Sequence, residues 1–211
     1  MAMTEEKIPQ WLNWARRLQA ISQSGIHFAK NDFDLERFEK IQEISTEIMQ
    51  NYTNLPNNYW LEEFSSQKGY ATPKVAVRAA VFNDHHILLV KERMDGRWSM
   101  PGGWADLNDP PSKMIEREVM EESGYIVKAS KLIAVHESNH NVEPLEYWHS
   151  YKLVFLCDLL GGYAHTSIET TEIDFFPFDN LPELSPSRIS LDDIKEAYYY
   201  LDHPDETAYF D

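Results

Sequence analysis

Apolar residues recur at intervals of three and four positions in the first third of the chain. This spacing predicts a helix over 9–24 with Gly25 as its stop. A second helix is predicted from an N-cap at Asp34 to Gln50, and a short helical piece over 59–65. Two helices of this size bury little apolar surface by themselves. We therefore expect them to pack on each other and on a further surface, either the next domain or a partner subunit.

Each long helix should present one apolar stripe. The positions that form these stripes are Trp11, Leu12, Ala15, Leu18 and Ile21 in the first helix, and Leu35, Phe38, Ile41, Ile44 and Ile48 in the second.

From residue 74 the pattern changes to that of β-strands. Two apolar runs flank a polar Asn83-Asp84 pair and predict a hairpin. The predicted strands cover 75–82, 87–90, 126–135 and 151–159, and the predicted helices cover 111–123 and 190–201. This order of elements predicts an α+β domain, residues 67–211, preceded by a small all-helical domain, residues 1–66.

Composition excludes several classes of protein. Nineteen basic and 35 acidic residues give a net charge of −16, which disfavours stable binding to duplex nucleic acid or to anionic membranes. No apolar run approaches the roughly 20 residues that a membrane-spanning helix needs. The acidic N-terminus does not resemble a secretory signal, so we expect a cytoplasmic protein. The one cysteine, Cys157, lies in an apolar run and is interpreted as a small buried hydrophobe.

Three acids share one face of the predicted helix over 111–123. Glu118, Glu121 and Glu122 stand at positions i, i+3 and i+4. Like charges this close need relief from solvent, a basic residue or cations, and Mg²⁺ prefers oxygen ligands of this kind. Taken alone, the triplet also fits a solvated acidic surface.

The residues around this triplet resemble the Nudix box. Gly103 is followed after five residues by Asp109, then after seven by Arg117-Glu118-Val119, Glu121-Glu122 and Gly124. The pattern departs from the family at Asp109, which replaces glutamate, and at Tyr125, which replaces an aliphatic residue and should pack. The resemblance implies a Nudix fold, a mixed β-sheet sandwiched by helices, and hydrolysis of nucleoside diphosphate derivatives that depends on Mg²⁺ or Mn²⁺.

The N-terminal pattern also resembles a known domain. It is similar to the helical domain that precedes the Nudix domain in a bacterial subgroup, and the matching residues begin at Trp11, Trp14 and Arg16. Proteins of this subgroup dimerise through the added helices, so the resemblance implies a homodimer.

The resemblance also implies the roles of the box residues. Glu118, Glu121, Glu122 and the carbonyl of Gly103 would hold the metal, and Arg117 would steady the carboxylates. Asp109 would pair with Arg117 and brace the loop. Three residues remain open as the general base: Glu118, Glu169 and Glu172.

Substrate recognition lies outside the box. The basic candidates for phosphate binding are Arg78, Lys91, Arg93 and Arg97, with ordinary salt bridges as the alternative. The aromatic candidates for stacking on the nucleoside are Trp104 and Trp148, followed by Trp98, Tyr147 and Phe176, with core packing as the alternative. The histidines His136, His140 and His149 lack a companion cysteine and a close pair, which disfavours a zinc site.

The first substrate prediction is CDP-choline, cleaved to CMP and phosphocholine. ADP-ribose, cleaved to AMP and ribose 5-phosphate, is the alternative. A further alternative is a nucleotide-sensing Nudix module without catalysis. Isomerisation of an isoprenoid diphosphate would need a reactive cysteine, and Cys157 in an apolar strand is poorly suited to that role.

Overall fold

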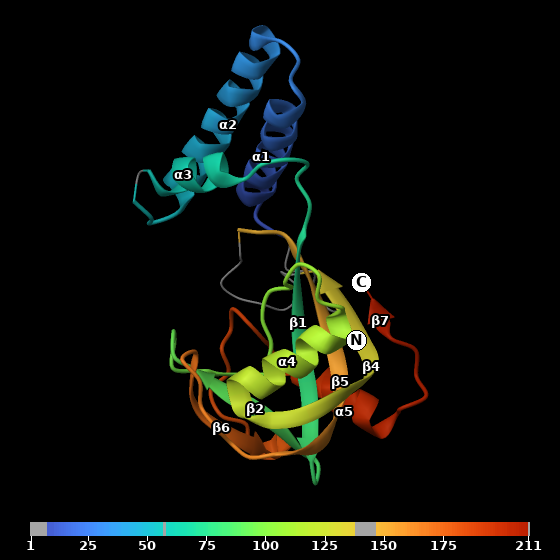
Figure 1. The fold of residues 1–211 in the computed structure, drawn as a ribbon. Helices are drawn as coiled ribbons and strands as arrows, with labels where there is room; N and C mark the ends of the chain where they lie inside the picture. Colours follow the sequence, from blue (N-terminus) through green and yellow to red (C-terminus); the bar gives the residue numbers. More distant parts are fainter. Residues whose placement is uncertain (1–7, 57, 138–146, 211) are drawn as a thin grey trace. The chain divides into compact units, whose positions relative to one another are not determined.

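The computed structural model describes residues 8–56, 58–137 and 147–210, and the chain forms two compact units (Figure 1). The first unit is Met1–Pro73 and the second is Lys74–Asp211. The boundary predicted after residue 66 coincides with the end of the third helix, whereas the structure divides the chain after Pro73. Among the described residues, no helix is both long and apolar enough to cross a membrane.

The described residues of the first unit form three helices, as predicted. Helices α1 (Gln10–Phe28) and α2 (Asp32–Tyr52) form a hairpin, and α3 (Tyr59–Ser66) packs against α2. The hairpin interior contains small and polar side chains, since Ala15, Ser22 and Ser45 are buried. The hydroxyl of Ser45 donates to the carbonyl of Ala15 at 2.8 Å, so the two helix backbones lie close together.

Two helix boundaries predicted from the pattern are wrong. Gly25 does not stop α1. It lies inside the helix, where a Cβ atom would stand 2.2 Å from the ring of Phe38 on α2. The N-cap of α2 is Asn31 and not Asp34, because the Asn31 side chain accepts from the Asp34 N–H at 2.9 Å.

The predicted apolar stripes are also only partly inside the unit. Ile21 and Ile44 are about half exposed, while Gln19, Ser22 and Ser45 occupy the buried positions. These exposed apolar side chains are consistent with the expectation that the helices pack on a further surface.

The second unit is built on a mixed sheet that contains all the predicted strands (Figure 1). The strands are β1 (Lys74–Asn83), β2 (His86–Glu92), β3 (Trp98–Ser99), β4 (Tyr125–Glu137), β5 (Ser150–Gly162), β6 (Thr170–Phe176) and β7 (Tyr209–Phe210). Strand β1 runs parallel to β5, which pairs antiparallel with β4, and β4 pairs with β7. Strand β2 pairs with β3 and β6.

The β1–β2 hairpin holds the two parts of the sheet together at one end only. Its pairing is confined to Phe82 with Ile87 and Asn83 with His86, beside the turn. The turn residues Asp84 and His85 both have positive φ, as a tight two-residue hairpin requires. Beyond the turn, β1 and β2 are free to diverge.

Two helices cover opposite faces of the sheet (Figure 1). Helix α4 (Pro111–Ser123) packs on the face formed by Val77, Ala79 and Val81, and α5 (Leu191–Asp202) packs on the face that contains Ala80. This division follows from the alternation of side chains along β1. A short 3₁₀ turn, η1 (Phe178–Asn180), precedes α5.

The packing of Gly25 predicts that an alanine at this position destabilises the protein, whereas helix propensity alone would predict stabilisation. Alanine forms helices better than glycine by about 1 kcal/mol, yet the added methyl would overlap Phe38. We expect Gly25→Ala to lower the free energy of unfolding of the helical unit by about 1 kcal/mol or more, as measured by chemical denaturation. In a Phe38→Ala background the same change should be stabilising. A stabilising effect in both backgrounds would contradict the packing argument.

Candidate active site

A cleft of about 720 Å³ opens in the second unit where β1 and β2 diverge. Its walls come from β1, β5, the end of β2, the end of α4 and four loops. The lining residues are Ala76, Arg78, Glu92, Arg93, Met94, Gly102, Gly103, Trp104, Glu122, Ser150, Lys152, Ile168, Glu169, Ser187 and Arg188. Segments spread over more than half of the second unit therefore meet in one cleft.

Helix α4 delivers acidic side chains to this region. It covers the predicted residues and ends at Gly124, which adopts the left-handed conformation with φ 76°. Met114, Ile115 and Val119 are fully buried against the sheet and fix the rotation of the helix. As a result Glu122 is also carried inward, to 5% exposure.

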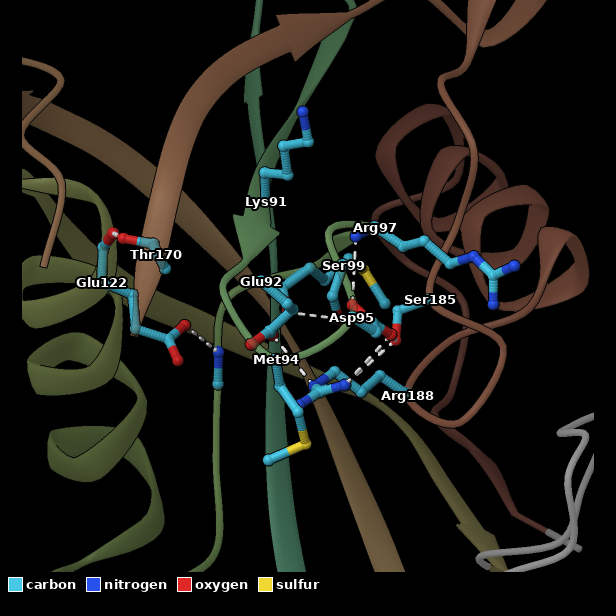
Figure 2. Close-up of polar contacts among 12 residues, drawn as sticks. Lys91, Glu92, Met94, Asp95, Arg97, Ser99, Glu122, Thr170, Ser185 and Arg188 are labelled. Carbon is cyan, nitrogen blue, oxygen red and sulfur yellow. Dashed lines mark hydrogen bonds and ion pairs between the residues drawn. The ribbon is translucent and has the colours of Figure 1, made fainter. Parts of the chain in front are cut away.

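The carboxylate of Glu122 is buried beside the loop that precedes the box. Its Oε2 atom accepts the Gly102 N–H at 2.8 Å (Figure 2). Burial raises the pKa of Glu122 to about 8, although nearby Arg78 and the Gly102 hydrogen bond oppose the shift. A charge in this position is costly without a cationic partner.

Glu118 lies one turn earlier and is mostly buried, with a side chain 13% exposed. Burial raises the pKa of Glu118, while the charge of Arg117 lowers it. A Cβ atom on Gly103 would stand 3.1 Å from Glu118 Oε2. Glycine at this position therefore leaves space beside the carboxylate.

Arg117 connects four acids at the outer edge of the helix. It lies 2.9 Å from Asp106, 3.2 Å from Asp109, 3.2 Å from Glu118 and 2.8 Å from Glu121. The predicted pairing of Asp109 with Arg117 is confirmed. The aspartate reaches the guanidinium although its side chain is shorter than that of the glutamate it replaces. Asp106 is a further partner that the sequence did not reveal.

Glu121 differs from its two neighbours. Its side chain is 57% exposed, bonds to Arg117 and does not line the cleft. Among the described residues, no three His, Cys, Asp or Glu side chains are close enough to hold a metal ion together. A site that used all three box glutamates would require Glu121 to leave Arg117.

Two backbone carbonyls also lie near the acids. The carbonyl of Gly102 accepts a hydrogen bond from Arg78 Nη1, and the carbonyl of Gly103 accepts the Val77 N–H at 2.9 Å. The predicted role of Gly103 as a metal ligand remains a prediction. The residues nevertheless fit a hard divalent cation, since Glu118 and Glu122 supply oxygen donors whose burial penalises uncompensated charge.

The candidate bases are separated by the structure. Glu169 lines the cleft. Glu172 lies in β6, is exposed and pairs with Lys91 at 2.6 Å. Neither Lys91 nor Glu172 lines the cleft, and the Lys91 side chain points away from Glu92 (Figure 2). The structure therefore does not place Glu172 in the candidate site.

The basic candidates divide in the same way. Arg78 and Arg93 line the cleft, and Arg93 Nε donates to the Ile168 carbonyl at 2.8 Å. Arg97 does not line the cleft and forms an ion pair with Glu183 at 2.9 Å. For Arg97 the structure therefore shows the ordinary salt bridge that was the alternative to phosphate binding.

Two basic residues of the cleft were missed by the sequence reasoning. Lys152 lies in β5 opposite Ala76 of β1 and is 8% exposed. A lone lysine inside an apolar run could have indicated it. Arg188 lies in the loop before α5, where no spacing or motif marks it.

Of the aromatic candidates, Trp104 lines the cleft and is half exposed. Trp148 does not line the cleft. The Lys74 ammonium lies over the rings of both tryptophans, 6.0 Å from the ring centre of Trp104 and 4.5 Å from that of Trp148. Trp98 packs on Phe176 against the core with ring centres 4.8 Å apart.

Two tyrosines complete the aromatic set. Tyr125 packs on Phe175 with ring centres 5.3 Å apart, as predicted for this departure from the box. Tyr147 packs edge-on against Trp148 at 4.8 Å and does not line the cleft.

The remaining reactive side chains have structural partners. Cys157 is buried in the core under α4, and burial raises the pKa of its thiol to about 12, which confirms its interpretation as a hydrophobe. His136 lies 2.7 Å from Glu196, and His149 lies 3.6 Å from Glu137. His140 lies outside the described residues.

The raised pKa of Glu122 makes the stability of the metal-free protein depend on pH. Its folded pKa lies above the ordinary value of 4.5, so its contribution to stability is complete below about pH 4.5 and is lost as the pH rises toward about 8. We expect Glu122→Gln, which stays neutral, to gain stability relative to the unsubstituted protein over this range. Chemical denaturation in EDTA at several pH values measures the difference.

The exposed neighbour Glu121 supplies the control for this experiment. Glu121→Gln changes the same charge on the same helix without removing a buried carboxylate. Its stability difference from the unsubstituted protein should vary much less with pH. A difference for Glu122→Gln that stayed constant from about pH 5 to about pH 8 would refute the assignment.

Comparisons with known proteins agree with the sequence resemblance. A family model described as the NUDIX domain matches residues 72–197, and one described as a UDP-X-like, N-terminal oligomerisation domain matches residues 9–61. The candidate ADP-ribose pyrophosphatase YjhB of Bacillus subtilis is 39% identical over 202 residues, which cover 96% of this chain and 97% of YjhB.

Solved structures show the same relationship. The crystal structure of a UDP-X diphosphatase is 30% identical, with a TM-score of 0.62 and coverage of 96% of this chain and 98% of that protein. An ADP-ribose pyrophosphatase from Streptococcus suis is 34% identical, with a TM-score of 0.61 and coverage of 66% and 100%. The predicted fold is confirmed, and the chain belongs to the Nudix hydrolase family.

Proposed function

We propose that this Nudix hydrolase cleaves the diphosphate bond of small nucleoside diphosphate derivatives. The observation that carries the proposal is that one cleft contains both the buried Glu122 carboxylate and basic side chains suited to phosphate. The protein as a whole is strongly acidic and repels anions. The basic side chains of the lining attract a small anion to the cleft locally.

Glu118 and Glu122 would hold Mg²⁺ or Mn²⁺, with Glu121 and the carbonyl of Gly103 completing the predicted set. When bound, the metal would neutralise the charge of the diphosphate and activate the attacking water. Arg117 orients Glu118 from the outer side through its 3.2 Å ion pair. The fit of these oxygen donors to a hard cation supports the assignment.

The other cleft residues would carry binding and proton transfer. Arg78 and Arg93 bind phosphate oxygens, and half-exposed Trp104 offers a face for the nucleoside. Glu169 takes the proton from the attacking water as the bond between phosphorus and the bridging oxygen breaks. Its position in the cleft lining favours Glu169 over Glu172 as the base.

CDP-choline remains the substrate proposed from the sequence, with ADP-ribose as the second candidate. The printed names of YjhB and the Streptococcus suis protein favour ADP-ribose, and that of the UDP-X diphosphatase adds uridine compounds. A nucleotide sensor without catalysis would bind these compounds and release no product.

A product-resolved screen tests this function. The protein with Mg²⁺ should convert at least one of CDP-choline, ADP-ribose and UDP-glucose into a nucleoside monophosphate and a second phosphate product. We expect Glu122→Gln to lower kcat by roughly 100-fold or more, because it removes a carboxylate on which charge neutralisation depends. Chromatography of the products measures both.

Glu172→Gln is the matched control, since it removes an exposed carboxylate outside the cleft. Turnover by this variant should stay within about threefold of the unsubstituted enzyme if Glu169 is the base. Thermal shifts with nucleotides but no product from any of them would support the sensor and end the proposal.

We also propose that the first unit forms a homodimer. On α1, Trp14, Ile21 and Phe28 are spaced by seven residues and are 49%, 51% and 61% exposed, so they form one apolar stripe. The match of this unit to a model described as an oligomerisation domain supports the proposal.

Light scattering at micromolar concentration should give the mass of two chains. Ile21→Glu should shift the protein to a monomer with little loss of helicity, because it places a charge in the stripe without touching the hairpin interior. Asn13→Glu, at an exposed position beside the stripe, should remain dimeric. A monomeric parent protein, or a dimeric Ile21→Glu variant, would contradict the proposed interface.

A further inference from the structure

Arg188 lies in the cleft on a tightly fixed segment between η1 and α5. The backbone of this segment pairs with β3, since the Ser185 N–H donates to the Trp98 carbonyl at 2.7 Å and the Trp98 N–H donates to the Glu183 carbonyl at 3.0 Å. Ile189, the next residue, is buried in the core. The position of Arg188 is therefore set by the fold.

The guanidinium is held on two of its three nitrogens (Figure 2). Nε lies 3.1 Å from Glu92 Oε1. Nη1 donates to Ser185 Oγ at 3.1 Å and lies 3.5 Å from Asp95 Oδ2. Asp95 is itself oriented by the Ser185 hydroxyl at 2.7 Å. These contacts fix the plane of the guanidinium before any ligand arrives.

The third nitrogen has only a weak acceptor. In the part of the chain that the structure describes, Nη2 contacts Met94 Sδ at 3.9 Å. A thioether is a poor acceptor, and the Met94 side chain, which also lines the cleft, is 86% exposed. The Nη2 group of a fixed guanidinium thus contacts a side chain that can move aside into solvent.

The surrounding charges could also be explained without a ligand. Glu92 is 7% exposed and lies within the influence of both Arg188 and Arg78. Arg188 could simply compensate Glu92 and Asp95. Such a role accounts for the contacts of Nε and Nη1 but leaves Nη2 with the thioether of Met94, a lining residue of the cleft.

We propose that Arg188 is a substrate-binding residue whose Nη2 group donates to a phosphate oxygen after displacing Met94. In Figure 2 the Glu92 carboxylate lies between Arg188 and Glu122, so Arg188 would bind the end of the diphosphate away from Glu122. An N–H of a guanidinium makes a charge-assisted hydrogen bond to a phosphate oxygen, which is stronger than its contact with a thioether. This inference rests on the proposed function.

Arg188→Lys tests the proposal while keeping a positive charge beside Glu92. We expect KM for the preferred substrate of the screen to rise about tenfold or more, with kcat within about threefold, because the lost contact is present before and during the reaction. The Kd of the preferred nucleoside diphosphate among ADP, CDP and UDP, measured in EDTA by calorimetry, should rise by a similar factor. The midpoint of thermal unfolding should change by no more than about 2 °C.

Lys195→Met is the control, since it removes an exposed ion pair with Asp192 on α5, away from the cleft. It should leave KM and the nucleoside diphosphate affinity unchanged. Unaltered KM and nucleoside diphosphate affinity in Arg188→Lys would reduce Arg188 to a structural partner of Glu92 and overturn the proposal.

The two readouts separate this inference from the proposed function. If no substrate is hydrolysed but a nucleoside diphosphate binds and Arg188→Lys weakens its binding, the hydrolase proposal fails and the phosphate contact stands. If the unsubstituted protein binds none of ADP, CDP and UDP, or if the variant binds the preferred one equally well, the contact is rejected whatever the enzyme hydrolyses.

Discussion

The cleft depends on the burial of one carboxylate. Glu122 accepts the Gly102 N–H through its side chain, and its own carbonyl accepts the hydroxyl of buried Thr170 at 2.8 Å. One residue thereby connects helix α4, the loop before the box and strand β6. Gly102 has φ 141°, and a Cβ there would stand 2.1 Å from the Val77 carbonyl oxygen, so only glycine permits this approach.

This connection places an energetically unfavourable charge at the junction of three elements. The raised pKa of Glu122 records the cost of burial, which hydrogen bonding to one N–H only partly offsets. A protein that keeps such a group benefits from it when a cation arrives, because binding removes the penalty. The pH dependence of stability and the proposed binding of a metal ion are thus two results of one constraint.

The cleft lining carries charges of both signs. Acidic Glu122, Glu92 and Glu169 share it with basic side chains, although the chain as a whole carries a net charge of −16. The basic members are Arg78, Arg93, Lys152 and Arg188. A diphosphate needs both kinds of neighbour, since its metal ions require carboxylates and its remaining oxygens require N–H donors.

Local patterns determined much of this protein. The limits of α4 and its end at Gly124 follow from helical periodicity and a left-handed stop, which depend on neighbours in the chain. The Nudix box was likewise recognised because its residues are near in sequence, and the resemblance that it carries implied the Asp109–Arg117 pair.

Only the tertiary structure decided which residues share the cleft. Glu169 enters and Glu172 does not, because strand pairing sends the latter to Lys91. Arg188 reaches the cleft through a loop that no motif marks, and Gly25 packs in a helix because Phe38 lies opposite. In each case the deciding contact joins segments distant in sequence, and side-chain pattern alone does not specify such contacts.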